Sequence, residues 1–106
     1  MSTFREIELI ESTIRHGRIY FSANDINFFP SDSFADRESD GHKGKDVCFD
    51  LDGKNLESDI RISSGQRISP RRSFARYLKL IGATEGGKLR ITRTSDRNYT
   101  VCYTSP

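Results

Sequence analysis

Apolar positions near the N-terminus alternate as they do in β-strands. The run from Phe4 to Ile14 predicts one strand, and His16-Gly17 predicts a turn into a second short strand at residues 18–21. Together these residues predict a hairpin-like unit.

A short helix and a long loop are expected next. Ser22 and Asp25 have the spacing of a capping box, which predicts a helix of about two turns that Pro30 ends. The segment from Ser31 to Asp46 is rich in Ser, Asp, Gly and Lys and is the most acidic stretch of the chain. Such a composition is typical of an exposed loop with a functional role.

Two hairpins are expected further along the chain. The Asp52-Gly53 dipeptide favours a tight turn between a strand at residues 47–51 and a return strand that ends near Ile62. A second hairpin is expected at residues 88–104 about the turn Ser95 to Arg97, because apolar side chains alternate on both of its strands. The residues expected to face inward are Leu56, Ile60, Ile62, Leu89, Ile91, Tyr99, Val101 and Tyr103.

A basic segment and a second helix lie between these hairpins. Residues 63–72 are polar, basic and too irregular for a buried element, which predicts a second long loop. Ser73 is expected to cap an amphipathic helix that Gly82 ends. The residues expected on its buried face are Phe74, Tyr77, Leu78 and Ile81, and those on its other face are Arg76 and Lys79.

The length and the element pattern predict a single domain. A chain of 106 residues has room for one hydrophobic core but not for a second independent one. Many short strands with two small helices favour a closed or nearly closed barrel, since closure removes exposed sheet edges. We therefore expect one domain over residues 1–106, of mixed α/β class and mostly β.

Charge is distributed unevenly along the chain. Residues 1–60 carry 7 Lys/Arg and 13 Asp/Glu, a net of −6, whereas residues 61–106 carry 10 and 2, a net of +8. A clustered positive field attracts phosphate groups and steers their approach. The basic half therefore predicts a polyanion-binding surface, although a merely solvated surface has the same composition.

Composition also bears on location. No stretch approaches the roughly 20 apolar residues of a membrane span, and Glu6, Glu8 and Glu11 stand where a signal peptide is apolar. We expect a cytoplasmic protein, associated with the nucleoid in a prokaryote or nuclear in a eukaryote, without a membrane partner.

The cysteines and histidines lack the spacing of a metal site. Cys48 and Cys102 lie in separate strand-like runs, which favours buried, reduced thiols, while His16 and His42 lie in turn or loop segments. We expect no metal and no cofactor.

Catalytic motifs are missing from the sequence. It contains no Gly-rich phosphate loop, nucleophile elbow or paired-His metal motif. Asp50, Asp52 and Lys54 loosely resemble the acidic and lysine residues of metal-dependent nucleases, but hairpin formation explains Asp52-Gly53 better. We expect no catalysis in this chain, and a small metal-dependent nuclease is kept as an alternative.

The motifs follow one another in the order of a known family. They are Gly17 to Phe21 followed by Phe29-Pro30, then Val47 to Lys54, then Phe74 to Leu80 followed by Gly86 to Ile91. In this order and spacing they resemble the B3-type DNA-binding pseudobarrel of plant transcription factors and of effector or target-recognition domains in some restriction endonucleases. The resemblance covers about residues 12–103 and implies an open seven-stranded pseudobarrel with two short helices. Gly87 replaces a usual acidic residue and Ser73-Phe74 replaces the Gly-Trp of plant members, which favours the prokaryotic branch.

The resemblance implies two arms that grip the major groove of double-stranded DNA. By position these arms are Ser12 to Arg18 and Arg61 to Arg72, and the second is the basic segment that charge already singled out. Arginine suits this task because its planar fork binds guanine O6 and N7 together. The residues expected to contact DNA are Arg15, His16 and Arg18 in the first arm, Gln66, Arg67, Arg71 and Arg72 in the second, and Arg76 and Lys79 on the helix.

Other residues have two interpretations each. Lys88, Arg90 and Arg93 are candidates for phosphate contact, although Arg90 and Arg93 also suit a solvated sheet face. Arg18 and Arg61 also suit ion pairs with nearby carboxylates. The aromatic residues Phe21, Phe28, Phe29, Phe74 and Tyr77 are expected in the core rather than stacked on bases.

The functional hypothesis is sequence-specific binding of double-stranded DNA. The chain would act as the recognition module of a restriction system or as a transcription regulator, with any cleavage in a separate domain, nuclease or regulatory partner chain. The alternative from another class is a protein-interaction or assembly module whose acidic half docks a basic partner.

Overall fold

Two β-sheets surround one core in the computed structural model, which describes residues 3–34, 44–63 and 67–106. One sheet has five strands in the order β1-β7-β8-β3-β4, and the other has three in the order β2-β6-β5. The strands are β1 (Thr3–Glu8), β2 (Phe21–Ser22), β3 (Val47–Leu51), β4 (Lys54–Ser58), β5 (Ile60–Ser63), β6 (Arg67–Pro70), β7 (Lys88–Ser95) and β8 (Asn98–Thr104). The helices are α1 (Glu11–His16), α2 (Ala75–Leu80) and the 3-10 helices η1 (Ala23–Phe28) and η2 (Ser31–Ser33).

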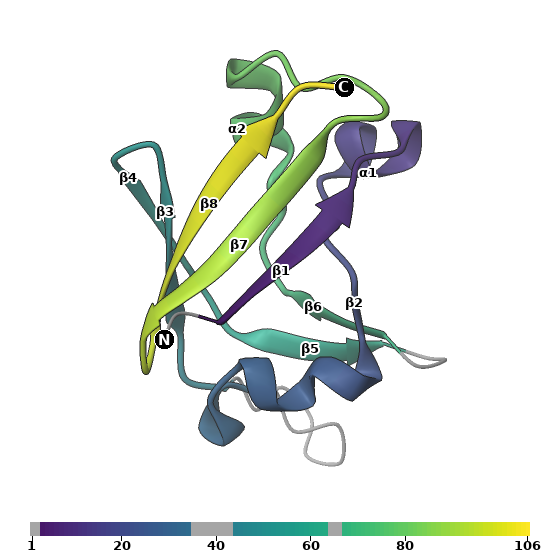
Figure 1. The fold of residues 1–106 in the computed structure, drawn as a ribbon. Helices are drawn as coiled ribbons and strands as arrows, with labels where there is room; N and C mark the ends of the chain where they lie inside the picture. The colour runs from purple at the N-terminus through teal and green to yellow at the C-terminus, as the bar shows by residue number, and fades with distance from the viewer. Residues whose placement is uncertain (1–2, 35–43, 64–66) are drawn as a thin grey trace.

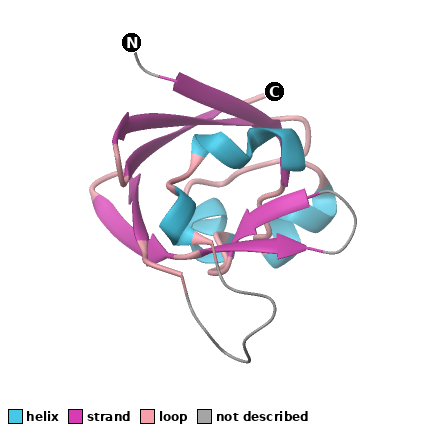
Figure 2. Ribbon diagram, turned by 90° about the horizontal axis from the view of Figure 1, so that it is seen from below, coloured by secondary structure: helices cyan, strands magenta, loops and turns pink. Residues whose placement is uncertain are grey.

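The sheets form an open pseudobarrel. In Figure 1, α1 and α2 cover one end of the five-stranded sheet and the 3-10 helices lie at the other end. Figure 2 shows the strands running around the outside of the molecule with helices across its ends. The mixed, mostly β fold class is therefore confirmed, with eight strands in the described part of the chain rather than seven.

Aromatic side chains fill the interior. Tyr99, Phe49 and Phe74 are almost completely buried, and Phe49 packs against the other two with ring centroids 5.3–5.4 Å apart. The Tyr99 hydroxyl donates a 2.6 Å hydrogen bond to the carbonyl of Phe28, which satisfies a polar group that burial would otherwise leave unpaired. The aromatic residues expected in the core are buried there: Phe21, Phe28, Phe29, Phe74 and Tyr77.

The closing hairpin is confirmed. The central hairpin is confirmed in its turn and its first strand, but its return strand, expected to reach Ile62, ends at Ser58, and residues 60–63 form β5 of the other sheet. Asp52 and Gly53 have φ of 54° and 90°, the left-handed conformation of a tight hairpin turn, and Asp50 Oδ1 accepts a hydrogen bond from the Gly53 N–H. The closing hairpin pairs β7 with β8 from Lys88 opposite Thr104 to Ser95 opposite Asn98.

The predicted helices are present with small changes. Ser22 Oγ accepts from the Asn24 N–H, so Ser22 caps the helix as expected. The Asp25 carboxylate accepts from Arg5 Nε and so does not complete a capping box, and the helix is of the 3-10 type. In α2, Ser73 Oγ accepts from the Ala75 N–H, and Gly82 ends the helix with φ of 66°. The expected faces of α2 are observed: Phe74, Tyr77 and Leu78 are buried, Ile81 is half-buried, and Arg76 and Lys79 are exposed.

Two stretches differ from expectation. The hairpin-like unit expected at the N-terminus is not formed, because β1 ends at Glu8 and pairs with β7, while β2 pairs with β6 in the other sheet. Residues 11–14, expected at the end of a strand, belong to α1. Residues 67–70 were expected in a loop but form β6, in which Ile68, Ser69 and Pro70 are buried against β5 and β2.

The cysteines also differ from expectation. Cys48 is half-buried and Cys102 is exposed, since both point away from the core side of their strands, and both thiols are free. Burial and nearby carboxylates raise the pKa of the Cys48 thiol above its ordinary value.

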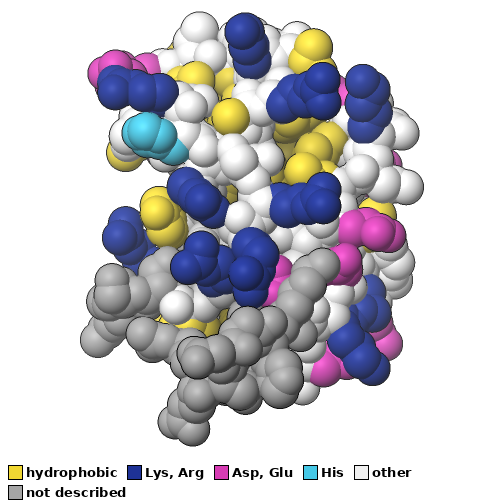
Figure 3. Space-filling view, turned by 180° about the vertical axis from the view of Figure 1, so that it is seen from behind, with side chains coloured by type: hydrophobic (Ala, Val, Ile, Leu, Met, Phe, Trp, Pro, Cys, Tyr) yellow, Lys and Arg dark blue, Asp and Glu magenta, His cyan; other side chains and the backbone are white. Residues whose placement is uncertain are grey.

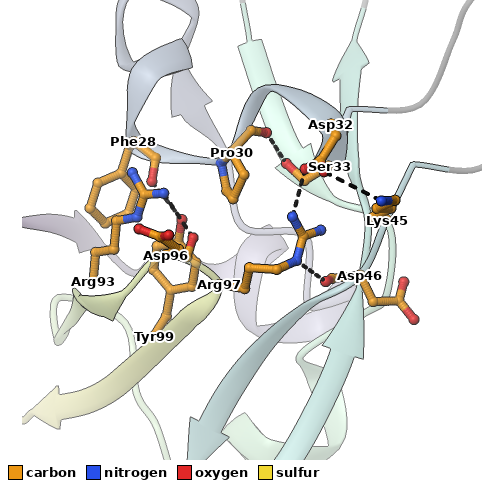
Figure 4. A network of polar contacts seen from close by, with 10 residues as sticks. All are labelled: Phe28, Pro30, Asp32, Ser33, Lys45, Asp46, Arg93, Asp96, Arg97 and Tyr99. Atoms are coloured by element: carbon orange, nitrogen blue, oxygen red, sulfur yellow. Dashed lines mark hydrogen bonds and ion pairs between the residues drawn. The ribbon is translucent and has the colours of Figure 1, made fainter.

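An ionic network centred on Arg97 joins Asp32, in η2, to Asp46, just before β3. Arg97 Nη1 binds Asp32 Oδ1 at 2.6 Å, and its Nε donates to the Asp46 carbonyl at 3.1 Å (Figure 4). Hydrogen bonding to Arg97 lowers the pKa of the Asp32 carboxyl. The network connects η2 and the start of β3 to the turn between β7 and β8.

None of the helices in the described residues is long and apolar enough to cross a membrane.

Candidate nucleic-acid interface

A cleft of about 320 Å³ lies between α1, the segment that follows it and the start of β6. It brings together the first expected arm and a residue of the second, which lie about 50 residues apart in sequence. The residues that line it are Ile10, Ser12, Thr13, His16, Arg18, Tyr20 and Arg67.

Three hydrogen bonds join residues 16–18, on one side of this cleft, to residues 71–74, which follow β6. They run from Ser73 Oγ to the His16 carbonyl at 2.8 Å, from the Phe74 N–H to the Gly17 carbonyl at 2.8 Å, and from Arg18 Nη1 to the Arg71 carbonyl at 2.7 Å. We call these three bonds the inter-arm clamp. One of these bonds reaches the second arm at Arg71, and the other two reach Ser73 and Phe74 just before α2, so the clamp fixes the first arm against the segment that follows β6.

Gly17 makes the clamp possible. Its φ of 69° is left-handed, and a Cβ at this position would lie 2.1 Å from the Ala75 backbone nitrogen and 2.2 Å from Ser73 Oγ. A residue with a side chain would therefore push α1 away from the start of α2.

Arg67 lies across an aromatic ring in the cleft. Its guanidinium carbon is 4.2 Å from the centroid of the Tyr20 ring, a cation–π distance. Both side chains are exposed, so the arginine fork stays accessible while the ring limits its freedom.

Arg71 has a different environment from Arg67. Its Nε donates a 2.7 Å hydrogen bond to Oδ1 of Asp59, which is 0% exposed, and this bond raises the pKa of the Arg71 guanidinium. Asp59 Oδ2 also accepts from the Gly44 N–H at 3.0 Å. Arg71, which follows β6, therefore has a structural role, because it neutralises the buried carboxylate of Asp59.

The other expected contact residues are exposed, with differing partners. Arg15 forms an ion pair with Glu11 one helical turn earlier, whereas Arg72 uses only its backbone N–H, which donates to Ser58 Oγ. Arg76 and Lys79 lie on the exposed face of α2, and Arg61 is exposed on β5. Gln66 lies outside the described residues.

The cations of the closing hairpin do not line the cleft. Arg90 lies over the Phe4 ring and 3.6 Å from Glu6 on β1, and Arg93 donates to the carbonyls of Asn27 and Asp96. The solvated-face interpretation of Arg90 agrees with these contacts. Arg18 binds a backbone carbonyl rather than a carboxylate.

Basic side chains dominate the face behind the five-stranded sheet. Figure 3 shows Lys and Arg side chains gathered over the middle of this face, with Asp and Glu side chains mainly towards one side. Basic side chains are thus prominent on this face.

Two lining residues had no signal in the sequence. Ile10 and Tyr20 looked like strand residues, yet they are exposed by 51% and 38%. Each directly follows a buried residue, Leu9 or Ile19, and therefore points away from the core.

The residues considered for a nuclease form part of the hairpin. Asp50 accepts from the turn backbone, and Asp52 occupies the turn itself. The described residues hold no group of three or more His, Cys, Asp or Glu side chains arranged to bind a metal.

Comparisons with known proteins support the fold. No family model and no curated protein matches the sequence. The hypothetical Arabidopsis thaliana protein At1g16640.1 matches with a TM-score of 0.64 and 12% identity, over 99% of this chain and 92% of that one. The N-terminal domain of Helicobacter pylori LlaJI.R1 matches with a TM-score of 0.68 and 16% identity, over 98% of this chain and 81% of that one. At these identities both likenesses concern the fold alone, and they agree with the mostly β pseudobarrel described above.

Proposed function

We propose that this chain binds double-stranded DNA with sequence preference, by placing its two arms in the major groove. The observation that carries the proposal is the convergence of His16, Arg18 and Arg67 on one clamped cleft within a basic face. Phosphate attraction explains the basic face, and an arginine fork held in a cleft is suited to reading a base edge.

The environments of the cations suggest a division of roles. Arg67 and His16 are exposed in the cleft and are the proposed base readers. Arg72, Arg76 and Lys79 are exposed and do not line the cleft, and they are the proposed phosphate contacts, which position the protein without reading sequence.

The fold also suggests a biological setting. We propose that the chain is the recognition module of a restriction system or a transcription regulator, in which any DNA cleavage belongs to another domain or chain. The two structural neighbours support the fold of such a module, and the basic face supports its ligand.

The test is fluorescence anisotropy with a randomised duplex pool at several salt concentrations, followed by sequencing of the bound duplexes. The logarithm of affinity should fall linearly with the logarithm of salt, with a slope of about −0.9 per neutralised phosphate. One sequence should be enriched. Absence of binding at low salt would refute the proposal and favour a protein partner.

A matched pair of variants tests the site. Arg67→Ala should weaken binding to the enriched sequence by roughly 10-fold to 100-fold, the range of one bidentate base contact. Arg90→Ala removes the same charge from the five-stranded sheet, where Arg90 contacts Phe4 and Glu6. This variant should change the affinity for the enriched sequence less than about twofold. Equal losses in the two variants would mean that net charge, not the cleft, accounts for binding.

A further inference from the structure

Apolar surface is exposed inside the basic cleft. Ile10 and Tyr20 are exposed by 51% and 38%, and both line the same hollow as Arg67. Isolated apolar residues are common on protein surfaces, but here two of them lie together beside cations, where apolar surface contributes nothing to phosphate binding.

The arginine in this cleft is already placed against apolar surface. Arg67 lies 4.2 Å from the centroid of the Tyr20 ring. A guanidinium held on a ring loses less conformational freedom when it binds a base edge. A base that binds the Arg67 guanidinium would therefore also contact the apolar surface of the cleft.

The major groove presents one apolar group. That group is the methyl on C5 of thymine, and 5-methylcytosine carries a methyl at the same ring position. Guanine presents O6 and N7 to an arginine fork in the same groove. A cleft that offers a fork next to exposed apolar side chains is complementary to a methylated pyrimidine beside a guanine.

We propose that Ile10 and Tyr20 form a contact surface for the C5-methyl group of a pyrimidine that neighbours the guanine read by Arg67. This inference rests on the proposed DNA binding and adds the chemical class of base that the cleft selects. The methyl group belongs to thymine or to 5-methylcytosine. Ser12, Thr13 and His16 supply the polar part of the same lining.

Duplexes that differ only in methyl groups test this proposal. Anisotropy at one salt concentration would compare the randomised pool with a pool in which deoxyuridine replaces thymidine and a pool in which 5-methylcytosine replaces cytosine. These exchanges leave the phosphate charge unchanged. If thymine is selected, removal of its methyl should weaken binding about fourfold, the factor for burial of one methyl-sized group. If 5-methylcytosine is selected, its addition should strengthen binding by a similar factor.

Matched variants connect the methyl effect to the cleft. Ile10→Ala should abolish the difference between methylated and unmethylated pools, whereas Ile26→Ala should keep it. Ile26 is 45% exposed, close to the exposure of Ile10, and lies on η1 outside the cleft. Both side chains are on the surface, so both variants should fold, which far-UV circular dichroism would verify.

The outcomes separate this inference from the proposed function. Salt-dependent DNA binding with equal affinity for all three pools would overturn the methyl contact and leave DNA binding intact. A methyl effect that persists in Ile10→Ala would also overturn it. Absence of binding to every pool at low salt would overturn both.

Discussion

Replacement of Asp59 by Asn should lower the free energy of unfolding by about 3 kcal/mol. Asp59 is 0% exposed and accepts two hydrogen bonds, from Arg71 Nε at 2.7 Å and from the Gly44 N–H at 3.0 Å. Asparagine keeps one acceptor, so one of these donors would face an NH₂ group. The charge-assisted bond contributes roughly 1.5–3 kcal/mol and a buried donor without a partner costs roughly 1–3 kcal/mol. The Arg71 side chain is 43% exposed, so water replaces part of the hydrogen bonding that Arg71 loses. The expected loss of about 3 kcal/mol therefore lies near the lower end of the sum of these two contributions.

Urea unfolding followed by far-UV circular dichroism measures this effect. With an m-value of about 1.5 kcal/mol/M, a loss of about 3 kcal/mol moves the midpoint by about 2 M. The control is Glu11→Gln, which breaks the exposed ion pair with Arg15 and should cost less than about 0.5 kcal/mol.

A double-mutant cycle makes the reasoning refutable. Arg71→Met keeps the length of the side chain but leaves the Asp59 carboxylate without its cation. The double variant with Asp59→Asn should be more stable than the sum of the two single losses predicts, by roughly 1 kcal/mol or more. A loss under about 1 kcal/mol for Asp59→Asn, or additivity within about 0.5 kcal/mol, would show that the two residues do not act as a buried pair.

Two further predictions concern the clamp and the core. Gly17→Ala should cost more than about 3 kcal/mol, because its Cβ would lie 2.1 Å from the Ala75 nitrogen, whereas Gly82→Ala, with φ of 66° and open space around it, should cost roughly 1–2 kcal/mol. Thermal melts by circular dichroism compare the two variants, and equal shifts would contradict the close packing at Gly17. Burial raises the pKa of Tyr77 and Tyr99 from 10.0 to about 12. The unfolded chain then loses these protons first, so the two tyrosines should lower stability between about pH 10 and 12, by roughly 1.4 kcal/mol per pH unit for each. Urea midpoints across this range measure the fall, and a flat profile up to pH 12 would contradict the burial of both hydroxyls.

Local sequence patterns predicted the elements whose causes are local. The Asp52-Gly53 turn depends on residues that tolerate positive φ, and the helix at residues 75–80 depends on apolar spacing together with Ser73 and Gly82. Each of these signals operates within about eight residues. They therefore do not depend on which distant strand packs against them.

The stretches that were predicted wrongly have distant causes. Residues 67–70 become a strand because β5 and β2 pair with both of their edges, and Arg71, just after them, neutralises the buried Asp59. Ile68 alone, between polar residues and Pro70, is a weak strand signal. Residues 11–16 form a helix that buries no residue completely, so their sequence shows little helical periodicity.

The candidate site stays a prediction as a DNA contact, but part of its geometry is observed. One arm was predicted by charge together with the resemblance and the other by the resemblance alone, and Arg18 and Arg67, one from each arm, line a common cleft. The buried pairing of Arg71 and the exposure of Ile10 and Tyr20 were not visible in the sequence. Burial of a charge and exposure of an apolar group depend on tertiary contacts that no short window contains.

The inter-arm clamp has a consequence for folding. Its three bonds join residues 53 or 57 positions apart, so the cleft forms only after a large part of the chain has been ordered. A partly folded chain would possess the basic residues without the geometry that brings them together. A ligand that recognises the cleft therefore binds the native state alone, and at 100 times its dissociation constant it would add about 2.7 kcal/mol to the stability of the whole domain.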